Sequence, residues 1–344
     1  MLLTRRKYLR IALFSDYFSD ENLYGGGVGT VVVNLARELC RRGHAVYVFT
    51  TSPDHTKMIR CERNLQIFQY ASIMRAWQTF ISLSLLINPL KHDVDVVHIE
   101  GGLVASLSAL LYSLIKRRPL IITVHHTGDV WKDPIKNLIV RLYEHSVFQV
   151  ILRKARKIIV PSRFLLSQSK HLSKFEEKIV EIPNGINETA ALALSKKEAR
   201  KILGLPTDTK IILFVGALCR RKGVHVLISA AREVVRKFTK CRFSLVGRET
   251  GETPDLKELI RNKGLDEYIK LTGYVSEFRK KLYYRAADLF VLPSLSEGFG
   301  LVILEAAANG LPLIVSDLPV FKTCLLYTSP SPRDLSTSRM PSSA

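Results

Sequence analysis

Two glutamates and several glycines lie close together near the end of the chain. Glu297 precedes a short apolar segment, 301–309, and Glu305 lies within it. The apolar run, with a glycine and a proline after it, predicts a short helix. Gly298 and Gly300 allow the backbone to approach a bound group closely, and the exposed amides of the first helical turn favour an anion. This stretch is therefore predicted to bind a sugar or a phosphate.

Glu305 is the only charged residue of the predicted helix. A buried carboxylate is costly unless hydrogen-bond donors surround it, and the hydroxyl groups of a sugar are such donors. The alternative is that Glu305 pairs with an arginine of a neighbouring element and that the glycines only shape a turn. The context favours a ligand, because strand-like segments, 288–294 and 311–316, flank the site. Ligands of open parallel sheets bind beyond the carboxyl ends of the strands.

The chain is strongly basic. Its 51 lysines and arginines outnumber its 31 aspartates and glutamates, which gives a formal net charge of +20. This charge could serve a nucleotide substrate, an anionic membrane surface or nucleic acid. Nucleic acid is disfavoured, because the sequence has no finger, arm or aromatic recognition motif and its basic clusters are dispersed. The clusters are Arg5-Arg6-Lys7, Lys116-Arg117-Arg118, Arg153-Lys154 with Arg156-Lys157, and Arg220-Arg221-Lys222.

Length and composition are those of a two-domain protein. The 344 residues, 47% of them hydrophobic, suffice for two cores. Apolar runs stay below the roughly 18 residues of a membrane-spanning helix, and the first residues lack a signal core. The five cysteines are widely spaced and have no nearby histidine partner, so neither zinc nor a disulfide framework is indicated. We therefore expect a cytoplasmic protein with mostly buried thiols and no metal.

Alternating strand and helix patterns predict two doubly wound, Rossmann-like parallel sheets that face each other across a cleft. The strands predicted in the first half are 11–14, 45–50, 94–99, 120–124, 157–160 and 178–182. Those predicted in the second half are 211–215, 242–246, 269–271, 289–292 and 313–315. The domains are expected at 1–187 and 208–323, joined by a linker, 188–207, that includes a helix-like segment, 195–203.

A glycine-rich run, 25–30, lies between the first predicted strand and a helix expected from about 31 to 42. In the dinucleotide-binding fingerprint a glycine or alanine would be needed where Val32 stands, and the strand ending at Thr50 lacks the ribose-binding acid. A Rossmann oxidoreductase is therefore disfavoured. A flexible glycine loop that closes over a cleft fits the run better.

Several short motifs occur in order along the chain. They are Gly25-Gly26-Gly27-Val28-Gly29 before Asn34-Leu35-Ala36-x-Glu38-Leu39, Thr123-Val124-His125, Val160-Pro161-Ser162, Pro183-Asn184-Gly185-Ile186, Val215-Gly216-Ala217-Leu218 with Arg221-Lys222-Gly223, and Glu297-x7-Glu305. Taken together, they resemble the motifs of the retaining glycosyltransferases of family 4, which have the GT-B fold. Each motif is weak alone, but their order and spacing from Ile11 to Phe321 make the resemblance specific.

The resemblance implies a nucleotide-sugar donor held mainly by the second domain, an acceptor held mainly by the first, and neither a metal nor another cofactor. The catalytic residues that it implies are His125, near the sugar, Glu297, which contacts the donor sugar, and Arg221 and Lys222. These two cations would stabilise the charge that develops on the leaving diphosphate. The residues implied to bind the donor are Gly26, Gly27, Gly298, Phe299, Gly300, Leu301 and Glu305, with Glu305 on the ribose hydroxyls.

The chain departs from the family pattern at two points. Many relatives carry arginine where this chain has Ala217, so the phosphate clamp would rest on Arg220 or Arg221. His126 directly follows His125, which leaves the histidine assignment open by one position.

We expect transfer to a lipid-linked, polysaccharide or other acceptor with retention of the anomeric configuration. The alternatives are a nucleotide-sugar epimerase or phosphorylase of the same fold and a non-catalytic module that binds nucleotide sugars. The apolar segment 80–87 and the basic clusters also predict peripheral binding of the first domain to an anionic membrane. The alternative for this segment is a core helix beside a solvated basic surface.

Residues 324–344 resemble the conceptual translation of a sequencing adapter, so the natural sequence is expected to end near Thr323. Family members continue past this point with further elements that include a helix crossing back to the first domain. A chain truncated there is expected to be poorly soluble or inactive. A Ser/Pro-rich disordered tail is the alternative, and in either case the segment carries no functional inference.

Overall fold

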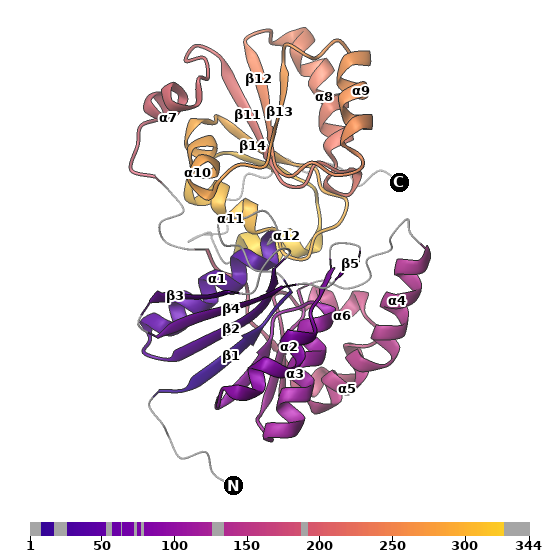
Figure 1. The fold of residues 1–344 in the computed structure, drawn as a ribbon. Helices are drawn as coiled ribbons and strands as arrows, with labels where there is room; N and C mark the ends of the chain where they lie inside the picture. Colours follow the sequence, from indigo (N-terminus) through magenta and orange to yellow (C-terminus); the bar gives the residue numbers. More distant parts are fainter. Residues whose placement is uncertain are drawn as a thin grey trace. The chain divides into compact units, whose positions relative to one another are not determined.

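The computed structural model describes residues 8–16, 26–52, 57–62, 64–71, 74–76, 79–125, 134–186 and 192–326. The chain divides into two compact units, Met1–Gly185 and Ile186–Ala344. Each unit is built on its own sheet, largely parallel in the first unit and fully parallel in the second, with helices against it (Figure 1). Both sheets confirm the predicted α/β architecture.

The first unit contains an eight-stranded sheet. Its strands are β1 (Arg10–Phe14), β2 (Ala45–Ser52), β3 (Lys57–Glu62), β4 (Leu65–Ala71), β7 (Val96–Ile99), β8 (Leu120–Thr123), β9 (Lys157–Val160) and β10 (Ile179–Glu181). They lie in the order β10-β9-β8-β7-β1-β2-β4-β3. All neighbours are parallel except β3, which pairs antiparallel with β4 at the edge. The pair β3 and β4 was not among the predicted strands.

Helices cover both faces of this sheet. The helices of the unit are α1 (Gly26–Arg41), α2 (Leu83–Ile87), α3 (Leu103–Lys116), α4 (Pro134–His145), α5 (Val147–Lys154) and α6 (Phe164–Gln168). Ile11 and Leu13 of β1 pack in one core with α1, whereas Ala12 and Phe14 pack in another with α3 and α5. Because successive strand residues point to opposite faces, this division shows that β1 is buried on both sides.

The glycine-rich run is helical where the structure describes it, so the predicted loop is wrong for residues 26–30. The helix α1 begins at Gly26, five residues before the predicted start. Val28 packs against the same core as Val32, one turn later, which extends the apolar stripe of the helix toward its start. Gly29 is buried, so the first turn can lie close to the sheet. Gly25 lies outside the described residues.

The apolar segment 80–87 is split between two elements. A short hairpin pairs β5 (Met74–Ala76) with β6 (Thr79–Ile81), and α2 follows. Leu85 of α2 is fully buried, but Leu83 and Ile87 are 58% and 65% exposed. The segment is therefore neither wholly core nor wholly surface.

The second unit contains a five-stranded parallel sheet in the order β13-β12-β11-β14-β15. Its strands are β11 (Lys210–Val215), β12 (Cys241–Val246), β13 (Ile269–Gly273), β14 (Leu289–Leu292) and β15 (Leu313–Val315). Its helices are α7 (Lys196–Leu203), α8 (Val224–Lys237), α9 (Thr253–Asn262), α10 (Glu277–Ala286), α11 (Leu301–Ala308) and α12 (Pro319–Leu326). The strands β14 and β15 have the predicted bounds, and α11 ends one residue earlier than predicted.

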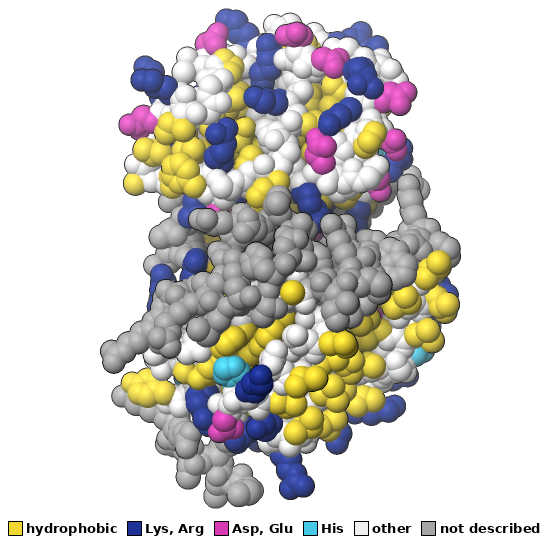
Figure 2. All heavy atoms as spheres, in the orientation of Figure 1, with side chains coloured by type: hydrophobic (Ala, Val, Ile, Leu, Met, Phe, Trp, Pro, Cys, Tyr) yellow, Lys and Arg dark blue, Asp and Glu magenta, His cyan; other side chains and the backbone are white. Residues whose placement is uncertain are grey.

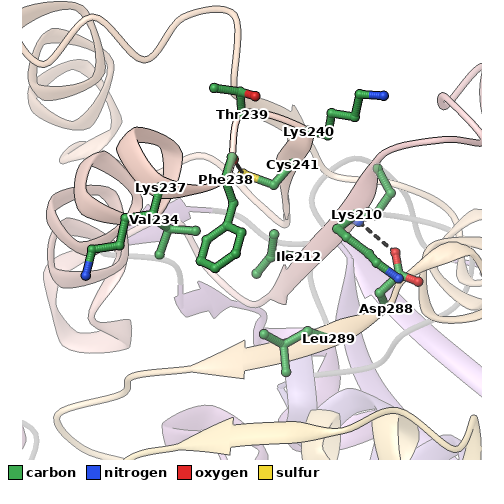
Figure 3. A pocket seen from close by; sticks show the side chains of 11 residues that line it. Lys210, Ile212, Val234, Lys237, Phe238, Thr239, Lys240, Cys241, Asp288 and Leu289 are labelled. Atoms are coloured by element: carbon green, nitrogen blue, oxygen red, sulfur yellow. Dashed lines mark hydrogen bonds between the residues drawn. The ribbon is translucent and has the colours of Figure 1, made fainter.

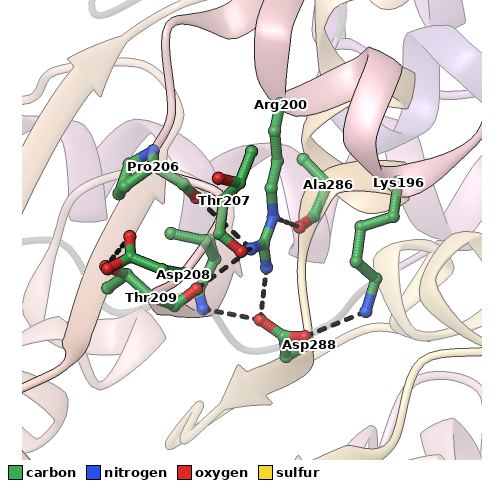
Figure 4. Close-up of polar contacts among 9 residues, drawn as sticks. Lys196, Arg200, Pro206, Thr207, Asp208, Thr209, Ala286 and Asp288 are labelled. Carbon is green, nitrogen blue, oxygen red and sulfur yellow. Dashed lines mark hydrogen bonds and ion pairs between the residues drawn. The ribbon is translucent and has the colours of Figure 1, made fainter.

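Part of the predicted linker belongs to the second unit. Ser195 caps α7 in a reciprocal capping box with Glu198. Arg200 of α7 is 5% exposed and donates to the carbonyl oxygens of Ala286, Thr207 and Thr209 and to the Asp288 carboxylate (Figure 4). These bonds join α7 and residues 206–209 to the end of α10 and to Asp288, directly before β14, so α7 is packed against the second unit.

The helix α12 extends into the predicted tail. Cys324 and Leu325 are buried in it, so the boundary at 324 falls within an element of the second unit. Residues 327–344 lie outside the described part of the chain. Among the helices that the structure describes, none combines the length and the apolar character needed to cross a bilayer.

Candidate functional site

The order of the second sheet defines where a ligand can bind in that unit. The chain winds outward from β11 to β12 and β13, and then in the other direction to β14 and β15. The point of reversal lies between β11 and β14. Open α/β sheets bind ligands at such a switch point, beyond the carboxyl ends of the strands. The loops after β11 and after β14 are therefore the structural candidates.

These two loops touch at Gly223, the residue before α8. Gly223 has φ +68°, and a Cβ atom on it would lie 1.8 Å from the carbonyl oxygen of Pro293. Only glycine allows this approach. The amide of Leu295 donates to the carbonyl oxygen of Arg221 at 2.9 Å, and the Arg221 side chain donates to the carbonyl oxygen of Ser296 at 3.1 Å.

The approach brings together Lys222 and Glu297. Lys222 Nζ lies 2.5 Å from Glu297 Oε1, and the two side chains are 16% and 6% exposed. Ser294 Oγ also donates to Glu297 Oε1, at 2.8 Å. Thus three of the four predicted catalytic residues, Lys222, Glu297 and the neighbouring Arg221, lie together at the switch point of the second sheet.

The negative charge of Glu297 also affects a thiol. Burial, and then the Glu297 carboxylate, raises the pKa of Cys324 to about 12. The Cys324 Sγ atom lies 3.8 Å from the carbonyl oxygen of Gly300. The thiol therefore stays protonated next to the site at neutral pH.

The predicted donor-binding residues 298–301 form the connection into α11. Phe299 and Leu301 are buried, so their side chains belong to the core of the unit. Gly300 is the residue before α11 and has φ +94°. A ligand can therefore contact only the backbone of these positions. This agrees with the prediction of a bound anion, because the backbone amides at the start of a helix bind anions.

Glu305 is buried in α11 and has two partners on α10. Lys280 Nζ is 3.0 Å from Oε1, and the Tyr284 hydroxyl donates to Oε2 at 2.8 Å. Burial opposes the positive charge of Lys280, but Glu305 and Glu277 outweigh it, so the pKa of Lys280 is raised. Burial and the Glu305 charge raise the pKa of Tyr284 well above its usual value. Glu305 therefore does pair with a cation of a neighbouring element, as in the alternative considered from the sequence, but the cation is a lysine and not an arginine.

The first sheet has a switch point of its own, between β1 and β7. Asp16 follows β1, and its carboxylate accepts from the amides of Val104 and Ala105 at 3.2 and 3.0 Å. Gly102 has φ +98°, and a Cβ atom there would lie 2.3 Å from the Asp16 carboxyl group. Burial raises the pKa of Asp16 to about 7, although the amides of α3 lower it.

Glu100 follows β7 and contacts His98 of β7, Thr123 of β8 and His125, two residues after β8. Its Oε2 atom is 2.8 Å from His125 Nε2, and its Oε1 atom is 3.0 Å from His98 Nε2. Thr123 Oγ1 lies 2.8 Å from His98 Nε2 and 3.3 Å from Glu100 Oε1. Burial disfavours the Glu100 charge, but both histidines favour it strongly enough to hold its pKa well below the usual range.

The structure thus places the fourth predicted catalytic residue, His125, in the first unit against Glu100. Gly26 and Gly27 form the start of α1 in the same unit. His126 lies outside the described residues. Sequence reasoning missed Asp16, Glu100 and His98. The available signal was an acidic residue within two positions of the end of each of two buried strands, β1 and β7.

A separate pocket of about 710 Å³ lies at the opposite edge of the second sheet (Figure 3). It is bordered by the amino ends of β11 and β14 and by Val234 and Phe238 at the end of α8. Lys210, Lys237 and Lys240 surround it. The predicted site residues do not line it, and parallel sheets bind ligands at the other edge.

Two family models match the chain. The model described as Glycosyltransferase Family 4 matches residues 25–190. The model described as Glycosyl transferases group 1 matches residues 195–325.

Curated relatives match along most of the chain. Phosphatidyl-myo-inositol mannosyltransferase of Mycobacterium leprae is 30% identical over 336 residues, which cover 92% of this chain and 81% of that protein. Alpha-monoglucosyldiacylglycerol synthase of Acholeplasma laidlawii is 25% identical over 329 residues, which cover 91% of this chain and 81% of that protein.

Solved structures share the fold. Sucrose-phosphate synthase from Thermosynechococcus elongatus aligns with a TM-score of 0.72 at 23% identity, over 90% of this chain and 81% of that one. Anabaena Alr3699/HepE in complex with UDP-glucose aligns with a TM-score of 0.67 at 20% identity, over 91% and 82%. These likenesses confirm the predicted fold, two doubly wound units of the GT-B type.

Proposed function

Because the chain belongs to glycosyltransferase family 4, we propose that it transfers a sugar from a nucleotide-sugar donor to a lipid acceptor with retention of configuration. The observation that carries the proposal is the Lys222–Glu297 pair at the switch point of the second sheet. A cation and a carboxylate there can bind two adjoining parts of one donor. The cation suits the diphosphate and the carboxylate suits the sugar hydroxyls.

In the proposed reaction the acceptor hydroxyl oxygen attacks the anomeric carbon on the face that the diphosphate leaves. The bond between that carbon and the phosphate oxygen breaks, its electron pair stays on the diphosphate, and the hydroxyl proton moves to a phosphate oxygen. Lys222 and Arg221 stabilise the negative charge as it develops. Glu297 acts as a positioning group for the sugar rather than as a nucleophile.

Glu305 is proposed to hold the ribose. Lys280 and Tyr284 each use one hydrogen-bonding direction of the carboxylate, and an ionised carboxylate offers about four. The two remaining directions suit the two vicinal ribose hydroxyls. The contacts within the unit then fix the orientation of the carboxylate before the donor binds.

A lipid acceptor agrees with the surface of the first unit. Curated relatives are named for phosphatidyl-myo-inositol and for a diacylglycerol lipid. In this chain, exposed aliphatic side chains gather on the first unit (Figure 2). Leu83 and Ile87 lie on α2, which packs against α3. Near the end of α3, Leu114 and Ile115 are 47% and 60% exposed. The exposed cations Lys116 and Arg117 follow directly.

The helix α4 presents a second apolar stripe. Ile135, Leu138, Ile139 and Leu142 are 60%, 57%, 38% and 61% exposed. Their spacing places them on one helical face, which a globular protein normally buries. Arg141 on the same helix is also exposed. An aliphatic stripe on a chain with a net charge of +20 fits an anionic bilayer, so we propose peripheral attachment to the cytoplasmic membrane face.

The proposal is tested by incubating the protein with UDP-, GDP- and ADP-sugars together with mixed lipid vesicles. The expected result is a glycolipid formed from one donor class, with the anomeric configuration of the donor in the product by NMR. Donor binding without hydrolysis or transfer to any acceptor would favour the non-catalytic alternative. A product of inverted configuration would contradict the proposed chemistry.

A further inference from the structure

The pairing of β7 with β8 builds a polar cluster at the switch point of the first sheet. Their register pairs Ile99 with Ile122, so the next positions, Glu100 and Thr123, are neighbours across the two strands. The carboxylate of Glu100 then reaches His125, two residues after Thr123, at 2.8 Å. The cluster therefore lies directly at the carboxyl ends of β7 and β8.

An ionised carboxylate only accepts hydrogen bonds, so the contact with Glu100 requires a proton on Nε2 of His125. The Glu100 side chain is 1% exposed and that of His125 is 6% exposed, so water competes little for this contact. The pKa of Glu100 lies well below its usual range, because the two histidines outweigh the effect of burial. Glu100 is thus ionised at neutral pH.

We propose that Glu100 is a positioning residue for the transfer reaction, which holds His125 as the Nε2–H tautomer and leaves Nδ1 to accept a hydrogen bond from a sugar hydroxyl group. The inference rests on the proposed role of His125 near the sugar. In this arrangement His125 accepts a hydrogen bond through Nδ1. A carboxylate that orients an imidazole through its far nitrogen commonly sets the tautomer of that ring.

His98 gives the cluster its second imidazole. It meets the other carboxylate oxygen of Glu100 and the hydroxyl of Thr123. With both oxygens engaged, the carboxylate cannot rotate without losing one of two buried contacts. This restricts the ring of His125 as well as its proton.

The tautomer can be measured in the wild-type protein. With ¹⁵N-labelled histidine, long-range ¹H–¹⁵N correlation spectra should show the proton of His125 on Nε2 at pH 7. The His125→Ala variant assigns the signal. A proton found on Nδ1, with or without one on Nε2, would overturn the inference without any variant of Glu100 having to fold.

Kinetics supply the second readout. Glu100→Gln should lower kcat by about 10–100-fold, the usual cost of losing an orienting partner, with less than about a threefold change in the donor KM. The matched control is Asp95→Asn, which neutralises a carboxylate that binds Arg10 beside the other end of β7. It should leave kcat unchanged.

The outcomes separate the inference from the function that it rests on. If His125→Ala abolishes transfer while Glu100→Gln keeps wild-type kcat, the positioning role is wrong and the proposed function stands. If His125→Ala itself retains wild-type kcat, the role of His125 near the sugar fails, and the role of Glu100 fails with it.

Discussion

At the scale of single residues, the proposed donor site depends on a lysine and a glutamate that are 75 positions apart in the sequence. Both side chains are mostly buried, so the pair is preorganised and is not a mobile surface contact. Preorganised charges stabilise a developing negative charge more than mobile ones, because they need no rearrangement during the reaction.

Replacing either residue should therefore remove most activity. We expect Lys222→Met and Glu297→Gln each to lower kcat by about 10²–10³-fold. Circular dichroism should show a retained fold, and steady-state kinetics measures the loss. The control is Lys257→Met, which breaks an exposed pair with Glu249 in the same unit. Turnover near the wild-type level in either site variant would contradict the assignment.

Glu305 should act on binding rather than on turnover. Glu305→Gln is expected to raise the donor dissociation constant by about tenfold, because one charge-assisted hydrogen bond contributes about 1.5–3 kcal/mol. Calorimetry with UDP, GDP and ADP measures the change. The matched control is Glu277→Gln, which also contacts Lys280 but is 54% exposed. An unchanged dissociation constant for Glu305→Gln would exclude the ribose role.

Asp16 predicts a pH dependence of stability. Its pKa is raised from 3.8 to about 7 in the folded protein, so the folded state binds a proton more tightly than the unfolded state does. The bound proton therefore adds to the free energy of unfolding. This stabilisation is fully present below pH 4 and is lost as the pH rises through 7. Asp16→Asn should remove the trend, so the stability of the variant relative to wild type rises over this range.

The upper bound of that rise is about 4 kcal/mol. Urea unfolding at pH 4, 5.5 and 7 measures it. Glu38→Gln, at an exposed carboxylate of the same unit, is the control. A stability difference between Asp16→Asn and wild type that stays constant from pH 4 to pH 7 would contradict the assignment.

At the scale of elements, Arg200 is the buried side chain that joins α7 to Ala286 and Asp288. Arg200→Met should destabilise the second unit by about 3–5 kcal/mol, because it leaves the carbonyl oxygens of residues 206–209 and the Asp288 carboxylate with fewer donors. Urea unfolding measures the loss. Lys201→Met, at the next and exposed position of α7, should change stability by less than about 0.5 kcal/mol. Equal stabilities of the two variants would exclude this attachment.

Much of the element order was predictable from the sequence. The strands β14 and β15 are short apolar runs bounded by proline, glycine and polar residues, which leaves little choice of bounds. The start of α1 was not predictable in the same way, because a run of glycines has low helix propensity and only packing against the sheet favours the helix. The strand β4 is stabilised by its pairing with β2, a long-range contact that cannot be predicted from the local sequence.

Part of the candidate site was also predictable from the sequence, because it depends on the predicted strands. The loop positions of Lys222 and Glu297 follow predicted strands, so their meeting at one edge of the sheet could be expected. Their direct contact depends on the close approach of Gly223 to Pro293, which the sequence does not indicate. The pairing of Glu305 with Lys280 also joins different elements, and the sequence offered no means to choose that lysine.

At the scale of the whole molecule, the first unit should carry the membrane contact. Leu138→Ser with Leu142→Ser on α4 should reduce sedimentation with vesicles that contain anionic phospholipid, because the variant buries less aliphatic surface in the bilayer. Binding of the wild type should weaken as salt rises. The control is Phe238→Ser, which removes a 66% exposed side chain from the second unit. If the wild type sediments equally with neutral and anionic vesicles at low salt, the proposed electrostatic attraction to the membrane is wrong.

The most direct test of the donor site is a crystal structure of the protein with a bound nucleoside diphosphate. The account predicts the diphosphate within hydrogen-bonding distance of Lys222 Nζ, at the start of α8, with the ribose hydroxyls at Glu305. Binding of the diphosphate at the other edge of the second sheet, among Lys210, Lys237 and Lys240, would contradict it.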